Sequence, residues 1–183
     1  ICQPKSRNLM LTTLGLNWVG YMKTVISALL LTTLALAPCT SFGDLAQAHE
    51  AVEAGDYESA MKLYRQIAEQ GDVIAQAMVG AFFNDGVGVP QDHKQAAKWF
   101  RLAAEQGDAK AQFNLGVMYA NGTGVLEDDK EAVKWYRLAA EQGNTKAQYV
   151  LGAMYANGNG VTQDYKEAGI WLRLAAEQGV APA

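Results

Sequence analysis

Cysteine is nearly absent from the sequence, and so are other residue types on which catalysis and metal binding depend. The only cysteines are Cys2 and Cys39, so the rest of the chain cannot form an internal disulfide. The two histidines, His49 and His93, are too few for a zinc cluster, which needs three or four converging ligands. Ser59 is the only serine after residue 43, and no histidine is expected beside it. We therefore expect no catalytic residue, metal or cofactor, with His49 solvated or capping a helix and His93 on the surface.

A basic surface is also missing. The chain has 15 Lys and Arg against 19 Asp and Glu, but Lys5, Arg7 and Lys23 are the only charged side chains before Asp44. The part from Asp44 onward therefore has 12 basic and 19 acidic residues, with no basic cluster. Phosphate contacts need a positive face, so we expect no nucleic acid among the partners. Intrinsic disorder is disfavoured as well, because apolar and aromatic residues recur regularly through this part. The length of 183 residues suits a single domain.

The beginning of the chain has the pattern of an export signal. The pair Met22-Lys23 precedes the apolar run 25–37, and small residues come shortly before Asp44. The apolar run is shorter than the ~20 residues that cross a bilayer, so an uncleaved anchor is less favoured. We predict a signal peptide over residues 22–43 and no stable membrane span in the mature form. A periplasmic or secreted location follows from this prediction.

Two further interpretations concern the same region. Residues 1–21 begin with Ile1 and have no periodicity that fits the rest, so we interpret them as non-native upstream translation and Met22 as the start. The residues before Cys39 resemble a bacterial lipobox, which makes a lipoprotein attached through Cys39 an alternative. It is less favoured, because Pro38 stands where that motif has a small residue.

A repeat of 36 residues organises the remaining chain. The tetrapeptide Ala-Glu-Gln-Gly occurs four times, always 36 residues apart, with its last Gly at 71, 107, 143 and 179. Residues 107–142 and 143–178 are identical at 24 of 36 positions. Such self-similarity at a fixed period is typical of repeat proteins. The repeat domain 44–183 is accordingly divided into the units 44–70, 71–106, 107–142 and 143–178.

Each full unit is predicted to form two helices and no strand. In the first helix, apolar residues recur at offsets of three and four, as in Ala111, Leu115 and Tyr119, which places them on one face. The second helix begins at an Asp that is followed three residues later by Gln or Glu, a capping-box arrangement. It ends at the repeated Gly, which can adopt the left-handed conformation that closes a helix. The capping pairs are Asp92–Gln95, Asp128–Glu131 and Asp164–Glu167.

A Gly-x-Gly-Val loop joins the two helices of each full unit. Such a loop before a helix can bind an anion, but here no strand precedes it and the third Gly of a dinucleotide fingerprint is missing. Turns that need a positive φ explain these glycines better. The pairs are Gly86 and Gly88, Gly122 and Gly124, and Gly158 and Gly160.

Large and small residues of the second helices recur in fixed columns. Because a single hairpin cannot bury its apolar face, neighbouring units must stack, and we expect the Trp column to pack between helices. The two Ala columns indicate close helix crossings, where a larger side chain would overpack. The columns are Trp99, Trp135 and Trp171; Ala96, Ala132 and Ala168; and Ala103, Ala139 and Ala175.

The pattern A-Q-x-x-L-G-x-M-Y-x-x-G-x-G-V, followed by D-x-x-x-A-x-x-W-x-R-x-A-A-E-Q-G, resembles the Sel-one-like repeat (SLR) family, a relative of the tetratricopeptide repeat. The resemblance covers residues 71–179 closely and 44–70 loosely, because the first unit lacks the Gly-x-Gly loop and turns tightly at Gly55. It implies an all-α fold, a right-handed solenoid of about eight helices with a concave surface lined by the first helix of each pair. It also implies a bacterial source and a role in protein–protein interaction.

The tetratricopeptide groove pattern, carried over position by position, gives candidate partner-binding residues. Aromatic rings there would provide contact area, amides would bond to a peptide backbone, and Lys would attract acidic groups. The alternative is that the rings simply fill gaps between neighbouring units. The candidates on the concave face are Ile74, Asn84, Lys110, Phe113, Val117, Asn121, Lys146, Tyr149 and Asn157.

The last unit differs from the others in its second helix. Ile170 stands where the earlier units have Lys98 and Lys134, so a charged column becomes apolar. Solenoid ends are normally polar. This end therefore docks another molecule, which suggests self-association near Ile170, or residues 180–183 fold back over it.

The leading hypothesis for function is an exported scaffold, not an enzyme, that binds a protein or peptide in a concave groove. The alternative comes from small secreted members of the family that resemble cell-wall fragment or β-lactam binding proteins with weak hydrolase activity. Those members have a Cys pair in each repeat, which this chain lacks.

Overall fold

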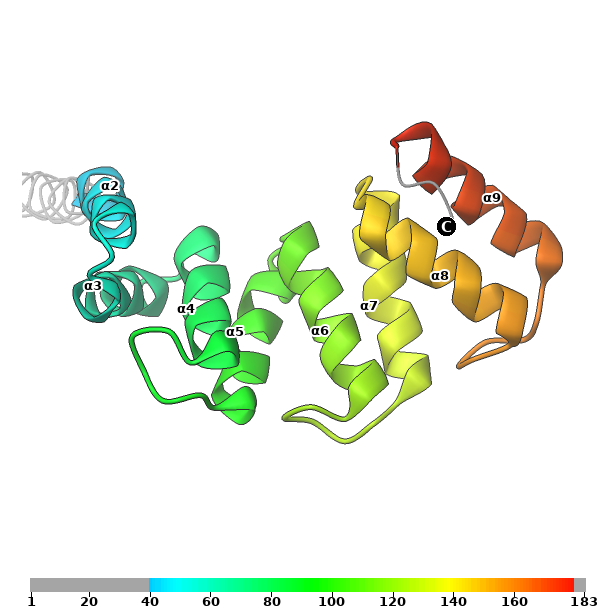
Figure 1. Cartoon of the computed structure of the whole chain (residues 1–183), viewed down its shortest axis with the longest axis horizontal. Helices are drawn as coiled ribbons and strands as arrows, with labels where there is room; N and C mark the ends of the chain where they lie inside the picture. The colour runs from blue at the N-terminus through cyan, green and yellow to red at the C-terminus, as the bar shows by residue number, and fades with distance from the viewer. Residues whose placement is uncertain (1–39, 180–183) are drawn as a thin grey trace, which may run out of the picture. The chain divides into compact units, whose positions relative to one another are not determined.

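A computed structural model describes the chain over residues 40–179, and its side chains from residue 43 onward. The predicted upstream segment 1–21, the tail 180–183 and all but the end of the predicted signal peptide lie outside these residues. The described part is all α-helical and contains no strand, as the sequence predicts. Its eight helices, labelled as in Figure 1, are α2 Thr40–Glu53, α3 Tyr57–Glu69, α4 Val73–Asp85, α5 His93–Glu105, α6 Ala109–Asn121, α7 Asp129–Glu141, α8 Thr145–Asn157 and α9 Tyr165–Glu177.

The helices pack in chain order as helix pairs. Within a unit, α4 packs against α5, α6 against α7, and α8 against α9; between units, each second helix packs against the next first helix. Figure 1 shows this succession from α4 to α9. Each hairpin thus buries its apolar face against its neighbours, which is the architecture of an α-solenoid. Among residues 40–179, none of the helices combines the length and apolar character needed to cross a bilayer.

The helix starts are capped as predicted, but the capping boxes are incomplete. The side chain of Asp128 accepts hydrogen bonds from the backbone amides of Lys130 and Glu131 at 2.9 and 3.1 Å. The backbone N–H of Asp128 donates instead to the carbonyl oxygen of Tyr119, 3.0 Å away in the preceding helix. The same backbone bond forms at Asp92 and Asp164. The predicted return bond from Gln95, Glu131 and Glu167 is therefore not needed, because its donor is already satisfied.

The predicted helix crossings are confirmed. Ala132 and Ala139 are completely buried, and a Cβ added at Gly116 would lie 2.8 Å from the ring of Tyr136. The Trp column does pack against the core, but only half-buried. The ring that fills the interior of each middle unit belongs to the next residue, Phe100 or Tyr136, each 3% exposed.

The Gly-x-Gly loops have positive φ at both glycines, as predicted. Each loop also packs against the backbone of the preceding unit. A Cβ added at Gly124 would lie 2.2 Å from the carbonyl oxygen of His93, in the second helix of the preceding unit. Gly88 and Gly160 approach Tyr57 and Asp129 in the same way. The second glycine is thus required by a close backbone approach as well as by its φ.

Candidate binding face on the first helices

The nine predicted groove residues lie on α4, α6 and α8, where none of them is buried. Lys110, Lys146, Asn121 and Asn157 are exposed, while Phe113, Val117 and Asn84 are half-buried. Ile74 is 52% exposed and Tyr149 is 38% exposed. The opposite side of the same helices holds the fully buried residues Ala75, Val79, Ala111, Leu115, Ala147 and Leu151. We call the set of nine residues the binding face.

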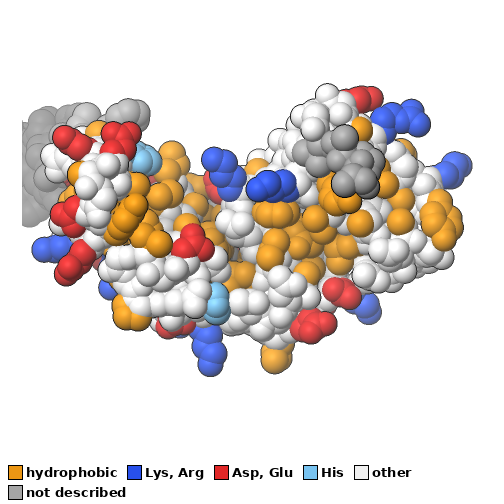
Figure 2. Space-filling view, in the orientation of Figure 1, with side chains coloured by type: hydrophobic (Ala, Val, Ile, Leu, Met, Phe, Trp, Pro, Cys, Tyr) orange, Lys and Arg blue, Asp and Glu red, His pale blue; other side chains and the backbone are white. Residues whose placement is uncertain are grey.

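The helices α6 and α8 are held next to each other at this face. Phe113 and Val117 of α6 pack against the same apolar cluster as Leu151 of α8. The side chain of Asn144, which caps α8, donates a hydrogen bond to the carbonyl oxygen of Ala109 at the start of α6, 3.4 Å away. Figure 2 shows hydrophobic side chains gathered over α6 and α8, with basic side chains at the edge of this area. The structure therefore places the predicted residues of these two helices on adjacent surfaces.

Phe113 has a structural contact as well as an exposed edge. Its ring lies 5.7 Å from the ring of Tyr136, which belongs to α7. Burial, helped by the negative charge of Asp129, raises the pKa of Tyr136 to about 12. The Tyr136 hydroxyl therefore stays neutral at physiological pH. Tyr149 is the more exposed aromatic residue of the face and is better suited to contact a ligand.

Charges and amides are arranged in the same order on α6 and α8. Lys110 and Lys146 lie in the first turns of α6 and α8, and Asn121 and Asn157 are the last residues of these helices. In α4 the corresponding residues are Ile74 and Asp85, whose carboxylate accepts a hydrogen bond from Asn84 at 2.8 Å. The face thus changes from an apolar and acidic end at α4 to a basic and aromatic surface at α6 and α8.

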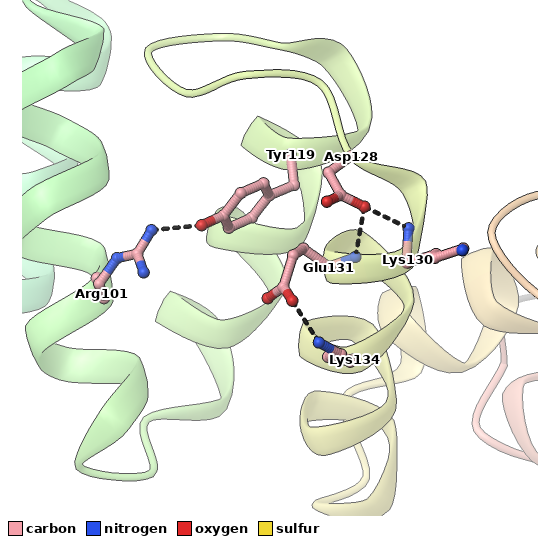
Figure 3. A network of polar contacts seen from close by, with 6 residues as sticks. All are labelled: Arg101, Tyr119, Asp128, Lys130, Glu131 and Lys134. Atoms are coloured by element: carbon pink, nitrogen blue, oxygen red, sulfur yellow. Dashed lines mark hydrogen bonds and ion pairs between the residues drawn. The ribbon is translucent and has the colours of Figure 1, made fainter.

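Sequence reasoning missed a row of Arg–aromatic contacts between units. Arg65, Arg101 and Arg137 each place a guanidinium over a ring of the next first helix, with distances to the ring centre of 5.5, 5.7 and 5.6 Å. Arg101 also donates a hydrogen bond to the hydroxyl of Tyr119, as Figure 3 shows, and Arg137 does so to Tyr155. The recurrence of Arg every 36 residues was a signal, but it did not identify the partner ring.

A second row, of buried glutamines, was also missed. Gln112 is 4% exposed; its amide nitrogen donates to the carbonyl oxygen of Ala104 in the preceding unit at 3.1 Å. Its amide oxygen accepts a hydrogen bond from Gln142 of its own unit at 2.7 Å. Gln76 and Gln148 make the equivalent bonds. A buried side-chain amide whose nitrogen and oxygen are both hydrogen-bonded fixes the positions of three helices relative to one another: the helix that carries it and the two that carry its partners.

The two histidines differ from their predicted surroundings. Nδ1 of His49 lies 2.8 Å from the hydroxyl of Tyr64, and the rings meet edge to face at 5.6 Å, so His49 neither caps a helix nor is simply solvated. His93 is half-buried at the start of α5, and its Nδ1 is buried without a partner among the described residues. The short turn between α2 and α3 accounts for the first contact, and the Gly124 loop of the next unit packs near His93.

The described residues offer little for catalysis. Among them, no group of three or more His, Cys, Asp or Glu is placed to hold a metal ion. Ser59 lies in the first turn of α3, where its backbone amide donates to the carboxylate of Asp56 at 3.1 Å. Hydrogen bonds from Ser59 lower the pKa of Asp56 below its ordinary value. Ser59 and Asp56 thus serve to cap the N-terminus of α3.

Comparison with known proteins fits this architecture. Four stretches match the Sel1 repeat family, at residues 46–72, 73–108, 109–144 and 145–180. A Sel1 repeat protein from Oxalobacter formigenes is 43% identical, with a TM-score of 0.69 over 74% of this chain and 54% of that one. A protective antigen of uropathogenic Escherichia coli strains, which has an SLR fold, is 42% identical, with a TM-score of 0.67 over 74% of this chain and 33% of that one. The chain thus spans about half and one third of the length of these two proteins.

A third solved structure is similar in fold alone. Cysteine rich protein B of Helicobacter pylori is 23% identical, with a TM-score of 0.53 over 68% of this chain and 89% of that one. No curated protein matches the chain. The repeat matches cover the described helices from α2 to α9, and the expected resemblance is confirmed. The chain belongs to the Sel1 repeat family.

Proposed function

We propose that the domain is an exported scaffold that binds an extended segment of another protein along the binding face. Sel1 repeat proteins are generally non-catalytic scaffolds that commonly mediate protein–protein interaction. The observation that carries the proposal is the exposed side of α6 and α8. Aromatic, amide and Lys side chains lie there, although a helix that serves only to build the solenoid does not need them on its exposed side.

The chemistry of the face fits a peptide with acidic groups. Tyr149 offers a ring at low conformational cost, and the amides of Asn121 and Asn157 can bond to an extended backbone. Lys110 and Lys146 are exposed and have no ion pair among the described residues. An acidic segment that runs across the starts of α6 and α8 would meet both ammonium groups.

A photo-crosslinking experiment tests the binding face directly. A photoreactive residue at position 149 is compared with one at Leu126, which is 89% exposed in a Gly-x-Gly loop. Both proteins are incubated with an envelope extract of the source organism. We expect one protein to be crosslinked at position 149 and not at 126. Equal crosslinking at both positions, or none at 149, contradicts the proposal.

A pair of tyrosine variants adds a quantitative control. Tyr149→Ala removes the exposed ring of the face, whereas Tyr57→Ala removes a ring of similar exposure, 42%, from α3. Affinity for the crosslinked partner should fall at least fivefold in Tyr149→Ala only. Phe113→Ala is a poorer probe, because the contact with Tyr136 couples it to stability.

Export is part of the same proposal. The predicted signal peptide lies outside the described residues except for Thr40–Gly43, which form the first turn of α2. Cleavage before Asp44 would leave the rest of this helix intact. Mass spectrometry of the protein from the source organism should find a mature N-terminus near Asp44 in the periplasm or medium. A lipid on Cys39 or an intact segment 1–21 would contradict this.

The hydrolase alternative is not favoured by any described contact. It would need a nucleophile beside a base, and Ser59 lies at a helix start with Asp56, not with a histidine. We propose that the domain is not an enzyme. Turnover of a β-lactam or a cell-wall fragment by the purified protein would overturn this.

Self-association near Ile170 stays a prediction from the sequence. Ile170 is 53% exposed on α9, and Leu174, one turn later, is 38% exposed. Sedimentation velocity over a wide concentration range measures it, and a constant monomeric mass would remove it.

A further inference from the structure

The dipeptide Asn-Gly occurs three times in the sequence, and its reactivity depends on the backbone around it. In such a pair the backbone nitrogen of the glycine can attack the side-chain carbonyl carbon of the asparagine, because glycine has no side chain to hinder the approach. The attack needs a backbone N–H that is free of other hydrogen bonds and an asparagine that can leave the helical conformation. The pairs are Asn121-Gly122, Asn157-Gly158 and Asn159-Gly160.

Two of the three pairs are held in a closed helix end. Asn121 and Asn157 are the last residues of α6 and α8, and both belong to the binding face. Gly122 and Gly158 each donate the backbone N–H to the carbonyl oxygen four residues earlier in the helix. Reaction at either asparagine would first break this hydrogen bond and unwind the last helical turn. The fold therefore protects these two amides.

The third pair lies in the Gly-x-Gly loop between α8 and α9, which Figure 1 shows. Asn159 is exposed there and lies outside any helix. Its own N–H donates to the carbonyl oxygen of Met154 at 3.1 Å, but the N–H of Gly160 donates to no acceptor within residues 43–179. No helix has to unwind before the nitrogen of Gly160 can react. The equivalent residues of the two earlier loops are Val87 and Thr123, so only the last of the three loops carries the pair.

We propose that Asn159 is a site of spontaneous conversion to aspartate and isoaspartate, whereas Asn121 and Asn157 keep their amides. The nitrogen of Gly160 forms a bond to Cγ of Asn159, and the side-chain amino group leaves as ammonia with the proton that this nitrogen loses. Water then opens the resulting cyclic imide. Attack at Cγ restores the ordinary backbone and gives aspartate. Attack at the backbone carbonyl leaves the chain running through the side chain, which is isoaspartate.

The isoaspartate product would disturb a junction between units. A Cβ added at Gly160 would lie 2.4 Å from the carbonyl oxygen of Asp129, at the start of α7, so the loop backbone passes directly against the preceding unit. Isoaspartate lengthens the main chain by one carbon at position 159, next to this contact. Closely packed groups accommodate little displacement. We therefore expect the modified loop to hold α8 and α9 less firmly against α7.

Incubation of the full chain at pH 8 tests the assignment. Peptide mapping by mass spectrometry follows the three asparagines separately, and fragmentation that distinguishes isoaspartate from aspartate identifies the products. We expect Asn159 to convert about tenfold faster than Asn121 or Asn157, because those two must first lose a helical hydrogen bond. In urea the three rates should be similar. Equal rates in the folded protein, or the same difference in rate in urea, overturns the proposal.

Two loop variants isolate the role of the free N–H. Asn159→Thr copies the loop of the preceding unit, so it should fold normally and show no conversion at this position. Thr123→Asn places an asparagine before Gly124, whose N–H also donates to no acceptor within residues 43–179. The introduced asparagine should react as fast as Asn159. If it is as stable as Asn121, the role assigned to the free N–H is wrong.

Aged protein tests the effect on the junction, and no partner is needed. Wild type incubated until Asn159 is fully converted should unfold at a lower urea concentration than fresh protein, and Asn159→Thr treated in the same way should not change. Asn159→Asp adds the charge without lengthening the backbone, so it should be close to fresh wild type. Aged wild type that is as stable as fresh protein would overturn the effect on the junction.

Discussion

The helix crossings and the binding face are two sides of the same repeated helices, and they differ in how much their apolar and aromatic residues vary between units. At the crossings, Ala111 and Ala147 are identical and completely buried. On the side of the binding face, Phe113 becomes Tyr149 and Val117 becomes Ala153, and all four are at least partly exposed, while the Lys and Asn residues of the face stay the same between α6 and α8. Packing at interior density tolerates little change of volume, whereas a solvated surface does. The crossings therefore maintain the solenoid, whereas residues on the binding face can change without loss of packing and so can adapt to a partner.

The largest effect is expected when a residue at a helix crossing is made larger. Ala132→Leu adds three carbons at a position with 0% exposure, and should destabilise the domain by about 3 kcal/mol through overpacking. Thermal unfolding followed by circular dichroism measures the effect. The same change at the exposed helical position Ala46 is the control and should be nearly neutral. An unchanged melting temperature in Ala132→Leu would disprove the assignment of a close crossing.

A loop substitution tests the junction between units. Gly124→Ala puts a Cβ at φ +74°, where it would lie 2.2 Å from the carbonyl oxygen of His93, and should cost about 2 kcal/mol. Gly143→Ala is the matched control, because its φ is +85° but nothing lies within 4 Å of the added atom. The control should show only the backbone cost of ~1 kcal/mol. Equal losses in the two variants would mean that the loop contact contributes nothing.

Much of this architecture could be predicted from the sequence, because local signals repeat. The 36-residue period, the helix starts at Asp128 and its equivalents, and the buried Ala columns all follow from spacing and residue type. Contacts between helices could not be predicted in the same way. The amide of Asp128 bonds to Tyr119 and Arg101 lies over the same residue, 18 positions away, and neither contact follows from a local pattern. His49 was misjudged for the same reason, since Tyr64 lies on another helix.

For the binding face, the sequence predicted which residues are exposed but not which of them also have structural contacts. The family pattern located exposed residues on α4, α6 and α8, and the structure finds none of them in the core. Exposure alone does not identify a ligand, however, and Phe113 proves to be shared between the face and the ring of Tyr136. The spacing of apolar residues in one helix could not reveal this, because the second ring belongs to α7.

Stability at alkaline pH tests the contribution of the buried Tyr136 hydroxyl. Burial raises the pKa of Tyr136 to about 12 in the folded protein, against an ordinary value near 10. Its contribution is thus fully present below pH 10 and is lost as the pH rises from 10 to 12. The expected loss is about 1.4 kcal/mol at pH 11. Urea unfolding at pH 8 and pH 11 should show a larger loss in wild type than in Tyr136→Phe, in which Tyr64, whose pKa is also raised by burial, still contributes; an equal loss in both would assign it to other groups.

The smallest expected effect compares the junction between α7 and α8 with α9 through a single residue type. Arg137→Ala removes a guanidinium that lies 5.6 Å from the centre of the Tyr155 ring and bonds to its hydroxyl, which should cost about 1 kcal/mol. Arg173→Ala removes the equivalent side chain from α9, where no ring of residues 43–179 meets it, and should change stability by less than ~0.5 kcal/mol. Urea unfolding of the two variants measures the difference. Equal losses would show that Arg contributes through its own helix and not through the ring of the next unit.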